Sequence, residues 1–529
     1  MDSVTSYKDY IKAAKECGMT ALCFSEHGNF FLYKKKKDEI EKNGMKYIHG
    51  IEAYVTEDIS NQVRDNYHMV LIAKNYDGFK ELNRLQSQAF QRDGHYYYAP
   101  RIPLDDILNT SENIIMTNGC IGGPVAKGND SVKEKVIHFF AEHKDRCFLE
   151  IQHHNVEKQK EYNKYLLELH NKYGIPLIAG TDTHCLNKEH EKARKIMQLS
   201  KRIAFNDDEA GWDLVFKTYD ELVEAYRIQN CLPESVYLEA IENTNVMAEM
   251  VEPITFDTSF KYPKLYDNSK EKLHKMIFDE RAVQSIVDEG YTKEEVIDRL
   301  QEEFDTFVAV DAVDYILLIK YIIDWAHGND MWQGPARGSA ASSLALYELG
   351  ITEVNPLKYG FKFWRFMHKD KYSAADVDTD WAEKDRDRLK EWMLVERLNL
   401  PRIQTAEIIT FNTIALKGAI RDVGRGLNIP LQEVDTIAKA VKEVSEEENK
   451  ITVIDDEWRQ KYPELFKYVD IVQGVFTSIG IHPSGVLVTD EDISEEIGYC
   501  YIKGDDYPVS VLDMKELDSR NFVKEDLLG

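Results

Sequence analysis

The first 200 residues alternate short apolar segments with amphipathic helical segments, and this alternation constrains the fold more than any other feature of the sequence. Apolar runs typical of strands lie at 20–24, 46–51, 69–73, 113–116, 148–152 and 176–179. Helical periodicity lies between several of them, at 7–17, 78–90, 132–143 and 156–173. Repeated strand–helix units favour an α/β fold. Because no dinucleotide fingerprint accompanies them, we expect a distorted (β/α) barrel or a related α/β fold.

Composition supports a folded multidomain protein and at first argues against a nucleic-acid partner. The chain has 529 residues, of which 43% are hydrophobic and 30% charged, so it is neither disordered nor a disulfide scaffold. Its net charge is −27, whereas phosphate binding needs a basic face. Residues 331–430 differ, because basic side chains slightly outnumber acidic ones there. The net charge therefore does not exclude a local nucleic-acid site.

Cysteine usage and hydropathy indicate a cytoplasmic protein without a membrane partner. The seven cysteines are scattered and contain no C-x-x-C pair, which is typical of reduced thiols. The longest apolar stretch, 313–325, is interrupted by Asp314, Lys320 and Asp324. Its apolar side chains fall on one helical face, so we expect an amphipathic core helix and not a membrane span. The first residues have no basic or apolar region of an export signal.

Side chains that commonly bind metal ions follow the strands predicted in the first 200 residues. In a (β/α) barrel, functional groups lie just beyond the carboxyl ends of the strands. The residues at these ends are Glu26, His27, Glu52, Cys120, His153, His154, Asp182 and His184. Imidazole, thiolate and carboxylate groups suit zinc, manganese or iron. Any one of them could be an ordinary loop residue or a hydrogen-bonded histidine, but the set together predicts a metal site.

Five segments of this region resemble successive motifs of the PHP domain, the polymerase-and-histidinol-phosphatase family. They are ALCFSEHGN, HGIEAYVTED, NYHMVLIAKN, TNGCIGG and AGTDTH. The resemblance implies that Zn²⁺ or Mn²⁺ is bound by Asp2, His27, Glu52, His68, Cys120, Asp182 and His184, with His154 as a further candidate. The family's first strand carries a His-x-His pair just before the position of Asp2, and this chain does not contain it. The resemblance therefore implies an incomplete ligand set and a barrel without its first strand.

The segment Trp332–Ser339, which runs into AASSLALYEL, predicts an anion site. A glycine-containing turn at a helix N-terminus presents backbone N–H groups and a positive dipole to an anion. Arg337 adds a charged donor, and Ser339 and Ser342 add hydroxyl groups. Taken alone, such a motif is more often a plain glycine–serine turn.

The aspartates 376, 378 and 380 alternate along the chain and predict a site for divalent cations. In an extended segment, their side chains share one face, where like charges repel unless cations lie between them. Two carboxylates that hold two Mg²⁺ ions are what an in-line phosphoryl displacement requires. A solvated acidic loop is the alternative.

Several further features follow this acidic segment. Lys417, Arg421 and Arg425 recur at every fourth position of a predicted helix, a basic stripe that suits a triphosphate or a template backbone, or else a solvated face. Residues 431–470 suggest charged helices with 443–448 as a turn. Residues 481–488 predict a turn that enters a buried strand, and Asp526 lies on a strand near the end.

These motifs occur in this order in the C-family of replicative DNA polymerases, the family of the bacterial DNA polymerase III α subunit, which the chain resembles over nearly its whole length. The resemblance implies catalytic aspartates at Asp376, Asp378 and Asp526 that hold two Mg²⁺ ions, whereas Asp380 is a less certain ligand. It implies nucleotide or DNA contacts at Arg337, Gly338, Ser339, Ser342, Arg365, Lys417, Arg421, Arg425 and His482. The implied domains are PHP at 1–205, a connection at 206–270, palm at 271–430, thumb at 431–475 and palm again at 476–529.

The chain departs from the family pattern in a few positions. Ala336, Ala375 and Glu525 stand where a glycine, a proline and an aromatic residue are usual, a divergence compatible with a phage-encoded protein. The family continues past the palm into fingers, a clamp-binding region and an OB-fold. We therefore expect the front part of a polymerase that needs the remaining fragment, with primer–template DNA, dNTPs, a sliding clamp and replisome subunits as partners. The alternatives are a PHP-type phosphoesterase or 3′–5′ exonuclease, and a non-catalytic half of a split polymerase.

Overall fold

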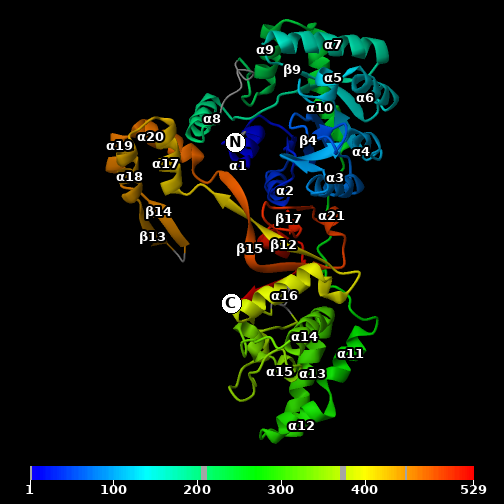
Figure 1. The fold of residues 1–529 in the computed structure, drawn as a ribbon, viewed down its shortest axis with the longest axis vertical. Coiled ribbons are helices and arrows are strands. Elements are labelled where there is room, and N and C mark those ends of the chain that lie inside the picture. The colour runs from blue at the N-terminus through cyan, green and yellow to red at the C-terminus, as the bar shows by residue number, and fades with distance from the viewer. Residues whose placement is uncertain (1–2, 204–210, 370–376, 447–448) are drawn as a thin grey trace. The chain divides into compact units, whose positions relative to one another are not determined.

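The computed structural model describes residues 3–203, 211–369, 377–446 and 449–529 and shows a mixed α/β protein of two compact units (Figure 1). Each unit is formed by two separate stretches of chain. The first unit combines Met1–Thr255 with Phe411–Gly480, and the second combines Phe256–Thr410 with Ile481–Gly529. The prediction of a multidomain α/β structure is therefore confirmed.

The first unit is built on a sheet whose strand order is β10-β9-β8-β5-β4-β7-β6, with β2 beside β4. In chain order these are β2 (Glu26–His27), β4 (Gly50–Thr56), β5 (Tyr67–Ala73), β6 (Tyr96–Tyr97), β7 (Ala99–Pro103), β8 (Ile114–Thr117), β9 (Cys147–Gln152) and β10 (Leu177–Gly180). A separate parallel pair joins β1 (Ala21–Cys23) to β3 (Lys46–Ile48). The six strands predicted from apolar runs are confirmed.

The strands in the described ranges do not close into the barrel that the alternation suggests. β5 runs antiparallel to both of its neighbours, β4 and β8, whereas a (β/α) barrel needs parallel strands throughout. The pair β1–β3 also stays apart from the larger sheet. The sheet is therefore mixed and open.

Helices connect these strands and end where the local sequence provides caps. They are α1 (Tyr7–Glu16), α2 (Tyr33–Lys42), α3 (Tyr76–Ala89), α4 (Leu104–Leu108), α5 (Pro124–Lys127), α6 (Asp130–Glu142), α7 (Glu157–Tyr173), α8 (Lys188–Ser200), α9 (Tyr219–Gln229) and α10 (Glu234–Met250). The side chains of Ser6, Asn75 and Asn129 accept N-terminal N–H groups of α1, α3 and α6. α7 ends at Gly174, whose φ of 69° is the left-handed conformation that glycine tolerates.

A helical group completes the first unit. It contains α17 (Leu416–Gly426), α18 (Leu431–Lys439), α19 (Asp456–Lys461) and α20 (Pro463–Val472), which share a core with Ile196 and Met197 of α8. Helices are confirmed in much of 431–470, but not beside the turn predicted at 443–448. There β13 (Lys442–Glu446) pairs antiparallel with β14 (Asn449–Val453). The β-branched Val444 and Ile451 lie opposite each other, and such pairs stabilise strands more than the surrounding charges favour a helix.

The second unit has a sheet of order β11-β18-β15-β12-β17-β16. Its strands are β11 (Thr379–Asp380), β12 (Gln404–Thr413), β15 (Phe476–Thr489), β16 (Tyr499–Cys500), β17 (Val509–Ser510) and β18 (Val523–Leu528). Of the turn into a buried strand predicted at 481–488, the buried strand is confirmed, because residues 484–488 lie buried in β15. The turn is wrong, because β15 runs without interruption through residues 481–483. Pairing with β18 begins only at Gly485, so the missing N–H group of Pro483 removes no hydrogen bond from that ladder.

Most helices of the second unit share one core with strands of this sheet. They are α11 (Ser269–Ile277), α12 (Glu280–Asp288), α13 (Lys293–Ala309), α14 (Val313–Gly328), α15 (Leu344–Glu348) and α16 (Glu383–Val395), with 3₁₀ turns η2 (Gly338–Ser342), η3 (Phe363–Arg365) and η4 (Arg397–Asn399). The short helices α21 (Ile493–Glu496) and α22 (Met514–Ser519) lie outside that core. The amphipathic helix predicted at 313–325 is α14, and Leu318, Ile319 and Ile322 lie in the core. No helix within the described ranges is long and apolar enough to span a bilayer.

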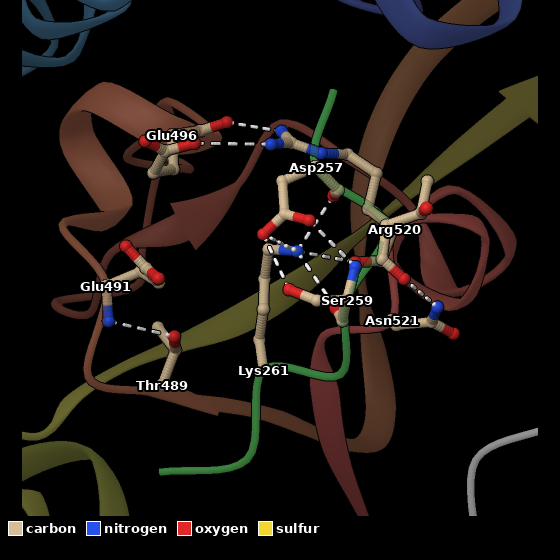
Figure 2. Close-up of polar contacts among 9 residues, drawn as sticks. Asp257, Ser259, Lys261, Thr489, Glu491, Glu496, Arg520 and Asn521 are labelled. Atoms are coloured by element: carbon tan, nitrogen blue, oxygen red, sulfur yellow. Dashed lines mark hydrogen bonds and ion pairs between the residues drawn. The ribbon is translucent and has the colours of Figure 1, made fainter. Parts of the chain in front are cut away.

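The start of the second unit is fastened to the turn that precedes β18 (Figure 2). The Lys261 backbone N–H donates to the Asn521 carbonyl at 3.0 Å. The Lys261 Nζ atom donates to the carbonyls of Asp257, Ser259 and Arg520 at 2.8, 3.1 and 3.2 Å. Burial lowers the pKa of Lys261, against the opposing effect of the nearby Asp257 carboxylate. The fully buried Arg520 donates to the Glu496 backbone and side chain (Figure 2). β18 thus begins from an anchored point.

Candidate functional site

Three of the predicted metal ligands meet in the first unit. His27 ends β2, Glu52 lies in β4 and His68 lies in β5, and their ligand atoms all fall within 4.8 Å of one another. The His68 Nδ1 atom lies 2.9 Å from the Glu52 Oε1 atom, and the His27 Nε2 atom lies 4.0 Å from the Glu52 Oε2 atom. The buried Nδ1 atom of His27 has no hydrogen-bond partner among the described residues. Two imidazoles and a carboxylate are a donor set that fits zinc or manganese.

Three further predicted ligands border this cluster. The Cys120 Sγ atom lies 3.7 Å from the His68 Nδ1 atom, and the His184 ring lies 5.9 Å from the His27 ring. The His184 Nε2 atom lies 3.2 Å from the Asp182 Oδ1 atom. Burial alone raises the pKa of Asp182, but its hydrogen bond and charge contact with His184 outweigh this and lower it to about 2. Burial raises the pKa of the Cys120 thiol well above its usual value.

Two other predicted ligands are His154 and Asp2. His154 is buried, burial lowers its pKa to about 4, and it is not part of the three-residue cluster. Neither of its ring nitrogens has a hydrogen-bond partner in the part of the chain that the structure describes. Asp2 lies outside the described residues.

Glu150 is a site residue that the sequence reasoning missed. It lies in β9, and its carboxylate accepts hydrogen bonds from the Thr117 hydroxyl at 2.6 Å and the Gln152 amide at 2.9 Å. Burial raises its pKa to about 7, and the carboxylates of Glu52 and Asp182 add to this effect. It lines, with Glu52 and Asp182, a cavity of about 1510 Å³. The signal in the sequence was a glutamate inside an otherwise apolar strand.

In the second unit, the strand register brings two predicted catalytic aspartates together. β11 pairs with β18 in parallel, and Thr379 lies opposite Leu527. One residue earlier are Asp378, directly before β11, and Asp526 of β18, and the continued register sets them side by side on the other face. Asp376 lies outside the described residues, and the strand predicted over 376–380 is described only for Thr379 and Asp380. Asp380 forms an ion pair of 2.6 Å with Arg337.

Asp526 is held by residues of β15. The Ser484 hydroxyl donates to the Asp526 Oδ1 atom at 3.0 Å, and the His482 Nδ1 atom lies 4.0 Å from the same oxygen. The Gly485 backbone N–H donates to the His482 Nδ1 atom at 3.0 Å, which fixes the imidazole beside the carboxylate. Sequence reasoning placed His482 here but missed Ser484.

The glycine–serine segment lies against these carboxylates. Gly338 has a φ of 61°, and a Cβ atom on it would lie 3.6 Å from the Asp378 Oδ2 atom. The Gly334 N–H donates to the Asp380 carbonyl at 2.8 Å. The segment differs from the expected helix N-terminus, because it forms the 3₁₀ turn η2 and the α-helix starts only at Leu344. Ser339 is exposed and Ser342 is buried.

A buried ion pair of α13 anchors this segment from behind, and no sequence motif pointed to it. The Glu303 carboxylate accepts hydrogen bonds from the Ser343 hydroxyl at 2.5 Å and from the Leu344 and Ala345 N–H groups at 2.9 Å each. Arg299 donates to Glu303 at 2.5 Å and to the Ser342 carbonyl at 2.7 Å. The anchor therefore joins the end of η2 to the start of α15.

The remaining predicted contacts are spread over both units. Arg365 is exposed in η3 of the second unit. The basic stripe belongs to α17 of the first unit, where Lys417 is exposed. Arg421 pairs with Asp435 at 3.0 Å, and Arg425 lies 3.5 Å from Asp422. Two of the three stripe cations thus already contact carboxylates.

Comparisons with known proteins find families that match both halves of the chain. A family model described as "Bacterial DNA polymerase III alpha NTPase domain" matches residues 264–529, and a PHP domain model matches residues 1–154. The relatives include proteins named DNA polymerase III subunit alpha from Aquifex aeolicus, 28% identical over the whole chain and 50% of that protein, and from Borreliella burgdorferi, 28% identical over the whole chain and 47% of that protein. One from Treponema pallidum is 29% identical over 92% of this chain and 43% of its own length. The chain spans about half the length of the curated relatives it matches.

Proposed function

The chain belongs to the bacterial DNA polymerase III alpha NTPase domain family, and from that premise we propose that it supplies the metal-binding part of a nucleotidyl-transfer site for DNA synthesis. The substrates are a primer 3′-hydroxyl and a deoxynucleoside triphosphate, and the metal-binding residues are Asp376, Asp378 and Asp526. One observation carries the proposal. The parallel register of β11 and β18 sets Asp378 beside Asp526, which lie far apart in the sequence.

Different groups of residues have different roles in the proposed reaction. When bound, two Mg²⁺ ions polarise the attacking hydroxyl and neutralise the triphosphate. Asp378 and Asp526 provide the carboxylates of adjacent strands, and Ser484 keeps Asp526 oriented. The backbone N–H groups of the Gly338–Ser339 turn donate hydrogen bonds to phosphate oxygens, and Arg337 and Arg365 add positive charge.

The wider assignments rest on the same premise. We assign Ser342 and His482 to the nucleotide site, and Lys417, Arg421 and Arg425 to the backbone of primer–template DNA. We also propose the division into PHP, palm and thumb expected from the sequence, although residues 411–430 of the expected palm pack in the first unit. The protein acts in the cytoplasm with the rest of the polymerase, a sliding clamp and other replisome subunits.

Neutral isosteres of the aspartates test the proposal in the complete polymerase. Asp378→Asn and Asp526→Asn each abolish nucleotide incorporation but leave primer–template binding intact, and Asp376→Asn does the same. Asp387→Asn is the matched control, because this exposed aspartate only pairs with the adjacent Arg386. Near-normal incorporation by the Asp378 and Asp526 variants would rule out the assignment.

A second candidate function belongs to the first unit. His27 and Glu52 of the three-residue cluster line a cavity together with Asp182 and His184, an arrangement that suits metal-assisted phosphoester hydrolysis, including 3′–5′ exonuclease activity. Hydrolysis of bis-(p-nitrophenyl) phosphate by the purified chain with Mn²⁺, and its loss in Glu52→Gln, would support this function. Absence of both bound metal and hydrolysis would dispose of it.

A further inference from the structure

Residues 358–369 form an exposed segment of unusual composition in the second unit. The segment reads KYGFKFWRFMHK, and no acidic residue occurs between Glu353 and Asp370. In a chain with a net charge of −27, four cations without one carboxylate form a local concentration of positive charge. Such a composition raises the local concentration of a polyanion.

Aromatic rings are exposed among these cations. Tyr359 is 59% exposed, Phe361 36% and Trp364 63%. The Tyr359 and Phe361 rings stack with centroids 5.5 Å apart and an interplanar angle of 26°. Exposure of several large rings on one segment costs free energy in water, so an exposed group of this kind marks a binding surface.

The segment is held firmly on its inner side. Phe363, Phe366 and Met367 are buried in the core of the second unit, and the Phe363 ring meets the Phe307 ring at 5.8 Å. Arg299 donates to the carbonyl of Phe361 at 3.4 Å as well as to that of Ser342. The segment with the exposed rings is therefore held by core residues and by Arg299, which also anchors the glycine–serine segment.

The three lysines of the segment, Lys358, Lys362 and Lys369, are exposed. None of them has an ion-pair partner among the residues that the structure describes, and the Lys358 Nζ atom only lies 5.9 Å from the Tyr359 ring. We propose that residues 358–369 form a binding surface for single-stranded nucleic acid, whose bases stack on Tyr359, Phe361 and Trp364 and whose phosphates contact the lysines. Stacking platforms interleaved with cations are the chemistry by which unpaired strands are bound.

A protein partner fits this surface less well. Protein interfaces are enriched in aromatic residues but depleted in lysine, whereas here lysines alternate with the rings. The proposal extends the proposed function, because it assigns unpaired nucleic acid to a surface that needs neither Asp378 nor Asp526. The two can therefore fail separately.

Binding of a fluorescein-labelled oligothymidylate to the purified chain, followed by anisotropy, tests the surface. Because stacking contributes about 1–3 kcal/mol per base, Tyr359→Ala combined with Trp364→Ala should weaken binding at least tenfold. Lys362→Gln combined with Lys369→Gln should reduce the slope of log K against log salt by about 1.4. Tyr219→Ala is the matched control, since Tyr219 is also 59% exposed but lies in α9 of the first unit.

Tryptophan fluorescence provides a second measurement that does not depend on a stability change. Stacking of a base on Trp364 should quench the emission of the chain, and Trp364→Phe should remove most of that quenching. Trp332→Phe should retain it, although Trp332 is 80% exposed. Asp387→Asn, which removes an exposed carboxylate of the same unit, should bind the oligonucleotide like the parent chain. Unchanged affinity in the Tyr359/Trp364 variant, or unchanged quenching in Trp364→Phe, would overturn the proposal.

Discussion

The hydroxyl group of Ser484 donates a 3.0 Å hydrogen bond to the Oδ1 atom of Asp526. The two residues lie on adjacent antiparallel strands, β15 and β18, in which Gly485 is opposite Asp526. A carboxylate held in this way has one oxygen occupied by a protein donor and the other free to face a cation. Such supporting hydrogen bonds orient metal ligands.

Loss of this hydrogen bond should weaken metal binding without unfolding the protein. We expect Ser484→Ala to lower the affinity for Mn²⁺, measured by calorimetry, by about tenfold. Ser510→Ala is the control, because Ser510 is also buried but donates to the Leu512 carbonyl. Equal Mn²⁺ affinities in the two variants would contradict the role of Ser484.

Gly338 should be required for nucleotide binding, and not only to allow the backbone to adopt a positive φ. Its φ of 61° makes any other residue strained by about 1 kcal/mol. Gly350 has a similar φ of 69°, but a Cβ atom added there would meet no other atom within 4 Å, whereas Gly338 faces the Asp378 carboxylate. Gly338→Ala and Gly350→Ala should therefore lose similar stability in urea denaturation. Only Gly338→Ala should weaken dATP binding in the presence of Mg²⁺.

The cluster of His27, Glu52 and His68 should bind zinc. We expect Zn²⁺ to raise the Tm of the chain and EDTA to reverse this, because a ligand that binds only the folded state stabilises it. Glu52→Gln should reduce the zinc retained after dialysis, measured by mass spectrometry, by about tenfold. Glu189→Gln is the matched control, since this exposed glutamate pairs with Lys467. Zinc retention by Glu52→Gln at the parent level would exclude the cluster as the site.

Stability should fall as the pH rises, through Glu348 of α15. Burial, with Asp279 and Glu303 nearby, raises the pKa of Glu348 to about 8, and neither carboxylate oxygen has a hydrogen-bond partner within the described residues. Between its ordinary pKa and 8, the unfolded chain loses this proton while the folded chain keeps it. The free energy of unfolding therefore decreases with pH in that interval.

Glu348→Gln removes this titration and provides the measurement. The variant should be more stable than the parent chain at pH 8.5, on the order of 1 kcal/mol after screening by solvent, and the difference should shrink toward pH 5. Glu353→Gln, an exposed neighbour, should show no such pH dependence. A constant difference between Glu348→Gln and the parent chain would refute the titration.

Lys261 should contribute strongly to the stability of the second unit. Lys261→Met leaves the carbonyls of Asp257, Ser259 and Arg520 without the donor that they share in Figure 2. We expect a loss of about 2–3 kcal/mol in the free energy of unfolding, measured in urea. Lys264→Met removes an exposed lysine nearby and should cost less than about 0.5 kcal/mol on the general scale of surface substitutions.

The periodicity of the sequence predicted helices and strands better than it predicted which residues contact one another. The apolar runs that became β5 and β9 were visible because alternation is a local property of the chain. The pairing of β13 with β14 was missed because their charged residues fit a helix or a turn as well as an exposed strand. Glu303 and Ser484 were missed for another reason. Their partners are distant in sequence, and only packing brings such residues together.

The candidate site was likewise predictable where it depends on local patterns and not where it depends on contacts between distant segments. Alternation placed Asp378 and Asp380 on one face, but nothing local to either segment predicts that β11 lies beside β18. The family resemblance grouped Asp378 with Asp526 as catalytic residues, and the structure supplied the strand pairing and its register. For Asp380 the structure adds the ion pair with Arg337, which the spacing of charges did not predict.

The division of each unit between two stretches of chain affects how the protein is made on the ribosome. Met1–Thr255 emerges first, but its partner Phe411–Gly480 follows only after Phe256–Thr410 has been translated. At roughly 5–20 residues per second, the nascent first unit waits on the order of 10 s for the helices that complete its core. During that interval the side of α8 that carries Ile196 and Met197 lacks its α17 and α20 partners. Trigger-factor-like chaperones that cover apolar surfaces should therefore bind translation intermediates that end before Phe411, and release those that extend past Gly480.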